Sequence, residues 1–384
     1  MSRTICAVIT ARPSYSRVKT ALRAMQAHPG IELRLVVAAS ALLDRYGTAA
    51  RIIEDDGFPI AAKVYSVLEG ENPAAMAKTT GLGLMELATV FDNLRPDVVL
   101  TVADRFETMA TAVAAAYMNI PLAHVQGGEV TGSIDEKVRH SITKLADLHF
   151  VATALAAERV IRMGEDPATV FVTGCPSIDI ALEMRRAPDP SFDPIRRYGG
   201  VGADLDLRGG YLVAMQHPVT TEHELARQQM ASTLHALASF DMPTLVFWPN
   251  VDAGADGTSN AIRTFRELER PTQMHFFKNM TPTDFLRLLD GAACLVGNSS
   301  VGVREAAYLG VPVVNIGTRQ TGRERGGNVR DAGYDAASIR QAIAAQLTHG
   351  RYAQDALYGD GAAGGRIARL LAEVPLHVEK RLMY

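Results

Sequence analysis

The feature that most constrains the fold of this chain is the alternation of short apolar runs with longer stretches of helical periodicity. Buried parallel strands read as short continuous apolar runs, and the helices that connect them cover both faces of the sheet. The first series of such runs lies at residues 4–10, 32–38, 98–102, 122–125, 148–151 and 170–172. Helical patterns fill the intervals, at residues 16–26, 41–55, 73–93, 107–118, 136–146 and 154–163. The sequence therefore predicts a doubly wound α/β domain over residues 1–185.

A second alternating series follows a segment of different composition. Residues 186–209 are rich in proline, glycine and charge and have no sustained period, so we predict a linker there. The later apolar runs lie at residues 211–215, 244–248, 274–276, 292–296 and 312–316. They predict a second Rossmann-like domain over residues 210–365, and a last helical stretch in 366–384 is expected to join the first domain. Ligands of such sheets bind beyond the carboxyl ends of the strands, so we expect the two domains to face each other across a ligand-binding cleft.

Composition narrows the class of protein. A chain of 384 residues is long enough for two domains, and its net charge of −3 argues against a nucleic-acid surface. Its three cysteines are far apart and lie in or beside apolar runs, which favours buried thiols in a reducing compartment. No cysteine spacing typical of a metal site occurs, and the first apolar run is too short for a signal peptide or a membrane span. We therefore expect a cytoplasmic protein without a metal ion or a membrane partner.

Charged residues follow several of the predicted strands in the first domain. Arg12 lies on the turn after the first strand, where a guanidinium can bind two phosphate oxygens at once. Asp104 and Arg105 follow the third apolar run, one residue after its end. The alternatives are a solvated loop arginine at the first position and a helix-capping carboxylate at the second. For Ser16 and Arg17, capping and surface charge are the stronger interpretation.

The richest stretch of the first domain is HVQGGEVTGSIDEKVRH, residues 124–140. It brings Gln126, Glu129, Asp135 and Arg139 close together in the chain, with three glycines that allow a ligand to approach the backbone. Several acids in one site suit acid–base chemistry, because different surroundings separate their pKa values, so that one carboxyl group can act as the acid and another as the base. Asp135 and Arg139 are one helical turn apart, and the alternative for them is an ordinary ion pair within a helix.

In the second domain, polar residues gather after two of the apolar runs. His217 follows the first run of this domain and precedes a proline, which favours a ligand contact over a core or capping histidine. Ser299 and Ser300 lie between a buried strand and a predicted helix, and the free N–H groups at a helix start form an anion site. Glu305, one turn into that helix, could bind a ribose hydroxyl pair, and Arg319 follows in a glycine-rich loop. The alternative is an ordinary βαβ crossover with polar turn residues.

Together these stretches resemble the UDP-N-acetylglucosamine 2-epimerases, and in particular the hydrolysing branch of that family. The matching motifs run in order from Arg12 to Asn328 and are TARPSYS, DRFE, HVQGGEVTGSIDEKVRH, GCPS, QHP and GNSSVGVREAAYLGVPVVNIGTRQTGRERGGNV. The resemblance implies the GT-B fold, in which the second of two Rossmann-like domains holds most of the nucleotide. It also implies an anti elimination of UDP through a 2-acetamidoglucal. Water then adds to give a free N-acetylmannosamine-type sugar for sialic or legionaminic acid synthesis.

The resemblance also implies roles for the residues already singled out. Asp104 and Asp135 match catalytic carboxylates, Arg139 lies beside them, and His217 is contributed by the second domain. The remaining matches are binding positions for UDP or the sugar: Arg12, Arg105, Gln126, Ser299, Ser300, Glu305 and Arg319. No cofactor is expected, and the substrates are a UDP-sugar and water. The protein is expected to form a dimer or tetramer of identical chains.

One position departs from the family pattern. Many members carry a catalytic glutamate where this chain has Gln126, and an amide cannot act as a base. Either Glu129 takes part in its place, or Asp104 and Asp135 suffice. The departure also leaves open a different sugar, such as a 2,4-diacetamido-trideoxyhexose, or a different nucleotide. Three other activities remain as alternatives: a non-hydrolysing epimerase that makes UDP-N-acetylmannosamine, a glycosyltransferase of the same fold, and a nucleotide-sugar sensor.

Overall fold

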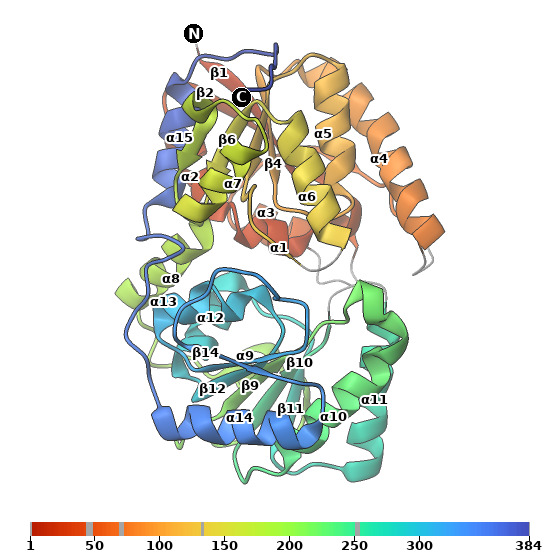
Figure 1. The fold of residues 1–384 in the computed structure, drawn as a ribbon, viewed down its shortest axis with the longest axis vertical. Coiled ribbons are helices and arrows are strands. Elements are labelled where there is room, and N and C mark those ends of the chain that lie inside the picture. Colours follow the sequence, from red (N-terminus) through yellow and green to blue (C-terminus); the bar gives the residue numbers. More distant parts are fainter. Residues whose placement is uncertain (1, 44–48, 69–72, 132–133, 250–253, 384) are drawn as a thin grey trace. The chain divides into compact units, whose positions relative to one another are not determined.

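The structure is a computed structural model that describes residues 2–43, 49–68, 73–131, 134–249 and 254–383. Over these residues the chain divides into two compact units, each built on a seven-stranded sheet (Figure 1). Unit 1 comprises Met1–Glu129, Ile134–Ile180 and Tyr358–Tyr384, and unit 2 comprises Val130–Ser133 and Ala181–Leu357. None of the helices in the described ranges combines the length and the apolar composition that a membrane crossing requires.

The sheet of unit 1 is parallel, with its strands in the order β3-β2-β1-β4-β5-β6-β7. The strands are β1 (Arg3–Ile9), β2 (Ile31–Ala38), β3 (Ile60–Val64), β4 (Val98–Val102), β5 (Leu122–Val125), β6 (Leu148–Val151) and β7 (Val170–Val172). The order reverses between β1 and β4, as in a doubly wound sheet. The six predicted apolar runs all lie on strands. The prediction missed β3, because this edge strand alternates exposed and partly buried residues.

Helices cover both faces of this sheet. They are α1 (Arg12–Ser16), α2 (Lys19–Ala27), α3 (Ala49–Asp55), α4 (Pro73–Leu94), α5 (Thr108–Tyr117), α6 (Ile134–Leu145), α7 (Ala154–Arg162), α8 (Pro176–Arg186) and α15 (Ala363–Glu373). Alternate side chains of β1 pack in two different hydrophobic cores, one on each face of the sheet. Ile5 packs in the core that contains Leu22 of α2 and Ile367 of α15. Val8 packs in the other core, with Phe91 of α4. The doubly wound architecture predicted for the first domain is therefore confirmed.

The C-terminal helix α15 belongs to unit 1. Its first turn is capped by Asp179 of α8, which accepts hydrogen bonds from the N–H groups of Ala363 (3.0 Å) and Gly364 (2.7 Å). A Cβ on Gly364 would lie 2.6 Å from the carbonyl carbon of Thr20, so only glycine allows α15 to approach α2 this closely. At the other end of the helix, Arg3 Nη1 donates to the carbonyl oxygen of Leu371 at 2.6 Å.

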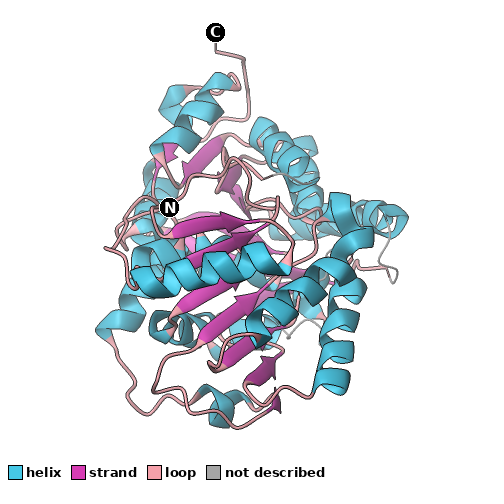
Figure 2. Ribbon diagram, turned by 60° about the horizontal axis from the view of Figure 1, so that its bottom comes forward, coloured by secondary structure: helices cyan, strands magenta, loops and turns pink. Residues whose placement is uncertain are grey.

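Unit 2 has the strand order β14-β13-β12-β9-β10-β11-β8. Its strands are β8 (Val201–Gly202), β9 (Leu212–Met215), β10 (Thr244–Phe247), β11 (Met274–Phe277), β12 (Cys294–Gly297), β13 (Val313–Ile316) and β14 (Val329–Ala332). Its helices are α9 (Pro194–Tyr198), α10 (Ala226–Ala238), α11 (Ala255–Glu269), α12 (Pro282–Gly291), α13 (Glu305–Leu309) and α14 (Ala336–His349). All strand pairs are parallel except β8 with β11. Figure 2 shows helices on either side of the strands, which confirms a second doubly wound domain.

The segment 186–209, expected to be a linker, instead belongs to unit 2. Asp193 caps α9 by accepting hydrogen bonds from the N–H groups of Ile195 and Arg196, both at 3.0 Å. The short strand β8 pairs with β11, where His275 is bonded to backbone oxygens on both sides of β8. Elements as short as α9 and β8 show no hydrophobic period, so the composition of this segment predicted a linker. The chain passes from unit 1 to unit 2 inside α8, between Ile180 and Ala181, and returns to unit 1 between Leu357 and Tyr358.

Candidate active site

The carboxyl ends of β4 and β5 have unusual backbone conformations. The two strands are adjacent and parallel, with Val102 opposite Val125. The next residue of each, Ala103 and Gln126, has a positive φ, 63° and 67° respectively. Residues with a Cβ rarely adopt this region, and strain of this kind is concentrated at functional sites. The backbone therefore bends sharply just before the polar residues that follow each strand.

Asp104 is the centre of a buried ion pair in unit 1. Arg139 of α6 pairs through Nη2 with Asp104 Oδ2, and its Nη1 donates to the backbone oxygen of Glu129 at 2.7 Å. Asp104 is 7% exposed and Arg139 is 1% exposed, so both charges are nearly removed from water. An unpaired charge in such a place would be costly, and the pairing offsets that cost. The fold thus brings three of the sequence candidates together.

Arg17 adds a second guanidinium to this group. Its Nη1 lies 3.7 Å from Asp104 Oδ1, and its side chain is only 16% exposed. The interpretation of Arg17 as a surface charge is therefore wrong. The helix α1 is so short that the chain turns again directly after it, and this turn directs Arg17 inward. A signal was present in the sequence, because Arg17 shares the first strand-to-helix connection with Arg12.

Three other candidates of unit 1 occupy different surroundings. Arg12 is the first residue of α1, and burial lowers the pKa of its guanidinium to about 10, so it remains charged at neutral pH. Arg105 forms an ion pair with Glu107, in which Nε lies 3.1 Å from Oε2. Asp135 lies in the first turn of α6, where the positive end of the helix dipole favours a carboxylate. It is one turn before Arg139 on the same helix.

Gln126 is fixed by the loop after β7. Its Nε2 donates to Cys175 Sγ at 2.9 Å, and Cys175 Sγ lies 2.9 Å from Ser177 Oγ. Gln126 is 1% exposed, and the loop that follows is closely packed. A Cβ on Gly128, whose φ is 74°, would lie 2.2 Å from the backbone oxygen of Ala156. Gln126 is thus a hydrogen-bonding group held in place at the strand end.

In unit 2 the adjacent strands β9 and β12 end at Met215 and Gly297, which lie opposite each other. Gly297 has a φ of 142°, and a Cβ there would lie 2.1 Å from the Met215 oxygen, so only glycine permits this pairing. His217 follows β9, and the side chain of Asn298 after β12 bonds to the His217 backbone. Arg319 Nη1 donates to the Asn298 oxygen at 3.3 Å. Asn298 thus connects two sequence candidates, although the sequence did not single it out.

The serine motif does not open an α-helix directly. Ser299 caps a single 3₁₀ turn, η5 (Ser300–Gly302). The helix α13 begins only at Glu305 and ends at Leu309, before Gly310, whose φ is 70°. The predicted helix start at the serines is wrong, because Glu305 is the first residue of α13. Gly302 interrupts the helical pattern, because glycine has a low helix propensity.

Comparison with known proteins identifies the family of this chain. A family model described as UDP-N-acetylglucosamine 2-epimerase matches residues 23–372. This chain belongs to that family. It is 32% identical over 377 residues to the UDP-N,N'-diacetylbacillosamine 2-epimerase (hydrolyzing) of Legionella pneumophila, and the match covers 98% of this chain and 97% of that protein. It is 29% identical over 361 residues to the UDP-N-acetylglucosamine 2-epimerase of Neisseria meningitidis, with 94% and 92% covered.

A solved structure supports the same assignment of the fold. The crystal structure of UDP-GlcNAc 2-epimerase from Neisseria meningitidis, bound to UDP-GlcNAc, matches this epimerase-family chain with a TM-score of 0.79. The match covers 96% of this chain and 99% of that one, at 17% sequence identity. Two Rossmann-like sheets, parallel except for β8, and this likeness together confirm the GT-B fold that the sequence resemblance implied.

Proposed function

We propose that this member of the family is a hydrolysing UDP-sugar 2-epimerase. The observation that carries the proposal is the buried group of Asp104, Arg139 and Arg17 beyond the end of β4. The name of the Legionella relative, a hydrolyzing 2-epimerase, supports the same choice. The substrate is UDP-N-acetylglucosamine or a UDP-linked 2,4-diacetamido sugar. UDP leaves by anti elimination through a 2-acetamidoglucal, and water adds to give the free C2-inverted sugar.

The proposed chemistry needs a base and a stabilised leaving group at the same time. The C2 hydrogen is not acidic by itself, and it becomes removable as C1–O cleavage builds positive charge at C1. Asp104 supplies the carboxylate base, and the ion pairs with Arg139 and Arg17 hold its side chain in place. Asp135 and Glu129, two further acids of unit 1, are proposed to transfer protons to the intermediate and from water. His217 of unit 2 is a further proposed catalytic residue.

The leaving nucleotide is assigned mainly to unit 2. Ser299 and Ser300 offer hydroxyl and N–H groups to the diphosphate, and Arg319 adds a positive charge from the following loop. Glu305 is the proposed partner of the ribose hydroxyls. Its Oε2 is buried and has no hydrogen-bond partner among the residues that the structure describes, so it is an acceptor available to a ligand. Arg12 of unit 1 is a further proposed anion contact.

A second candidate reaction uses the same residues. In a non-hydrolysing epimerase UDP itself adds back to the glucal, which gives UDP-N-acetylmannosamine. The Neisseria relative, named simply UDP-N-acetylglucosamine 2-epimerase, favours this alternative. The two reactions differ in their products, because one releases UDP and the other does not.

Two further parts of the proposal concern the setting of the enzyme. A cytoplasmic location is supported by the three cysteines, which are buried and are not joined in disulfides. Assembly into a dimer or tetramer is supported by exposed apolar side chains on neighbouring helices, Met85 of α4 (69% exposed) and Tyr117 of α5 (82% exposed). Sedimentation of the purified protein would test the assembly.

Proton NMR in deuterated water tests the reaction. The protein is incubated with UDP-N-acetylglucosamine, and separately with the diacetamidobacillosamine nucleotide, without any acceptor. We expect UDP and a free sugar that carries deuterium at C2. Deuterium at C2 of an intact UDP-sugar would support the non-hydrolysing reaction instead. Hydrogen retained at C2 with both substrates would exclude both epimerases.

Asp104→Asn tests the proposed base, and β4 provides a matched control. Loss of a general base typically costs about 100- to 10,000-fold, so we expect turnover to fall by at least about 100-fold while UDP still binds. Asp97 precedes β4 at its opposite end, where its Oδ2 accepts a hydrogen bond from Thr4 N–H at 2.7 Å. Asp97→Asn keeps an acceptor for that bond and should retain full turnover. Full activity of Asp104→Asn would refute the assignment of the base.

A further inference from the structure

Asn298 is a buried asparagine that holds the backbone of His217. Its Oδ1 accepts a hydrogen bond from the His217 N–H at 2.7 Å, and its Nδ2 donates to the His217 carbonyl at 2.8 Å. Its own N–H donates to the carbonyl oxygen of Met215 at 3.2 Å. Asn298 is 1% exposed, so water does not compete for these bonds. The side chain therefore continues the pairing of β9 and β12 beyond the last paired residues of both strands.

A planar amide is the group that can make both bonds to His217. It presents an acceptor and a donor at a fixed separation, whereas a carboxylate only accepts and a hydroxyl has a single donor. His217 lies outside β9 and is followed by Pro218, which has no N–H of its own. The preceding residue is also fixed, because Gln216 Oε1 accepts a hydrogen bond from Thr233 Oγ1 at 2.7 Å. The imidazole is thus carried by a backbone that is held on both sides.

The backbone of Asn298 makes a separate connection to the arginine loop. Its carbonyl oxygen accepts hydrogen bonds from Gln320 Nε2 at 2.8 Å and from Arg319 Nη1 at 3.3 Å. These bonds remain possible when the side chain of Asn298 is replaced. A substitution at this position therefore separates the orientation of His217 from the contacts of the arginine loop.

We infer that Asn298 is a positioning residue for His217. The inference rests on the proposed function, in which His217 takes part in the chemistry on the sugar. Enzymatic rates depend steeply on orientation, and a displacement of about 1 Å can cost about 100-fold. Asn298 acts through the two backbone groups of His217 and is not itself a group that exchanges protons with the substrate.

Asn298→Asp is the sharpest variant, because it keeps the shape and the acceptor but places an oxygen against the His217 carbonyl. We expect kcat to fall about 10- to 100-fold. KM for the UDP-sugar and the dissociation constant of UDP should stay within about threefold of the unaltered protein. Asn298→Ser, which is neutral and smaller, serves as a second variant with the same expected pattern, so that poor folding of the aspartate variant does not decide the test.

A matched control lies on the neighbouring strand. Asn315 of β13 is 3% exposed, and its Nδ2 donates to Asp331 Oδ1 at 2.8 Å. Asn315→Ala removes a similarly buried asparagine bond in the same sheet. It should lower the thermal stability and leave kcat unchanged. An equal loss of kcat in the control would show that Asn298 acts only through stability.

A double-mutant cycle decides the inference. In a His217→Ala background, Asn298→Asp should cause no further loss, because no imidazole is left to position. An equal loss in both backgrounds, or a parallel loss of UDP affinity, would overturn the inference. Full kcat in His217→Ala would overturn it together with the role of His217. Failure of the proposed reaction itself would appear differently, as hydrogen retained at C2 with the unaltered protein.

Discussion

A buried histidine supports the strained residue that precedes Asp104. His124 of β5 has no exposed surface, and its Nε2 lies 2.8 Å from the backbone oxygen of Ala103. A carbonyl only accepts, so Nε2 carries the hydrogen, and Nδ1 can accept a bond from the Thr143 hydroxyl at 3.3 Å. Burial lowers the pKa of His124 to about 3, so the imidazole is neutral at neutral pH. A neutral donor thus holds the residue that directs the proposed base.

His124 predicts a loss of stability in mild acid. In the unfolded chain its pKa returns to about 6.5, so below that pH the unfolded state binds a proton that the folded state excludes until about pH 3. One such proton lowers the free energy of unfolding by about 1.4 kcal/mol per pH unit. We expect urea unfolding between pH 7 and 4 to show a shallower pH dependence in His124→Gln, which keeps a donor. The exposed His377→Gln should leave the dependence unchanged, and an unchanged slope in His124→Gln would contradict the prediction.

At the scale of secondary-structure elements, buried strands could be predicted from the sequence, whereas three of the edge strands, β3, β8 and β14, could not. A strand covered on both faces, such as β4, is a continuous apolar run, whereas the edge strand β14 contains Arg330 and Asp331 and has exposed residues. The residues of the candidate site likewise divide into those that could be predicted from the sequence and those that could not. Asp104 could be predicted because it follows a buried strand. The inward direction of Arg17 was signalled only by its place in the same strand-to-helix connection as Arg12. The bonds of Asn298 could not be predicted, because they depend on strand ends that no sequence period records.

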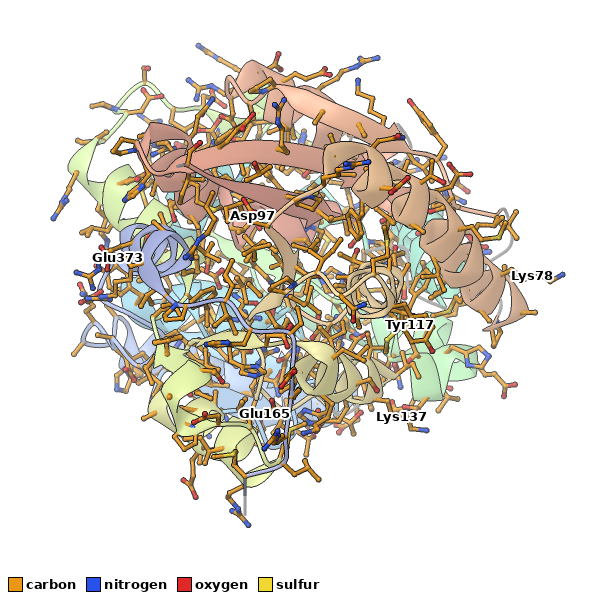
Figure 3. All side chains as sticks on the ribbon, turned by 90° about the horizontal axis from the view of Figure 1, so that it is seen from above. Lys78, Asp97, Tyr117, Lys137, Glu165 and Glu373 are labelled. Carbon is orange, nitrogen blue, oxygen red and sulfur yellow. The ribbon has the colours of Figure 1, made fainter. Side chains whose placement is uncertain are left out.

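The helix that carries Asp135 and Arg139 is held at its other end by the C-terminal segment. Lys380 Nζ lies 2.5 Å from Glu165 Oε2 and donates to the backbone oxygen of Thr143 at 3.2 Å, near the end of α6. Glu165 is 2% exposed, and Figure 3 shows it beside the C-terminal segment. Burial raises the pKa of Glu165, but its hydrogen bonds to His149, Lys144 and Lys380 outweigh burial and bring the pKa to about 2. The carboxylate is therefore charged and depends on its partners.

Lys380→Met should destabilise unit 1. The substitution leaves a buried carboxylate with fewer partners and removes a donor from the end of α6, which typically costs about 1–3 kcal/mol. Lys137 is an exposed lysine on α6, and Lys137→Met is the matched control. The free energy of unfolding, from urea titration at neutral pH, should fall in the first variant and not in the control. Equal stabilities would show that the C-terminal segment does not hold α6.

At the scale of the whole molecule, the fluorescence of one tryptophan side chain can follow the unfolding of unit 2. The chain has a single tryptophan, Trp248, which follows β10 in unit 2 and packs against its core. The guanidinium of Arg263 lies over its ring, 5.6 Å from the centroid. Unfolding of unit 2 exposes this ring to water and changes its fluorescence. Far-UV circular dichroism instead records the helices of both units.

UDP should therefore stabilise the state that Trp248 reports. A ligand bound only to the folded protein at 100 times its dissociation constant adds about 2.7 kcal/mol to the free energy of unfolding. We expect saturating UDP to move the fluorescence transition in guanidinium to higher concentration. Arg319→Ala should shrink this shift, because it removes a proposed contact of the leaving nucleotide. An unchanged fluorescence midpoint, together with a shifted circular dichroism transition, would assign the nucleotide to unit 1, since the ligand would then protect helices that Trp248 does not report.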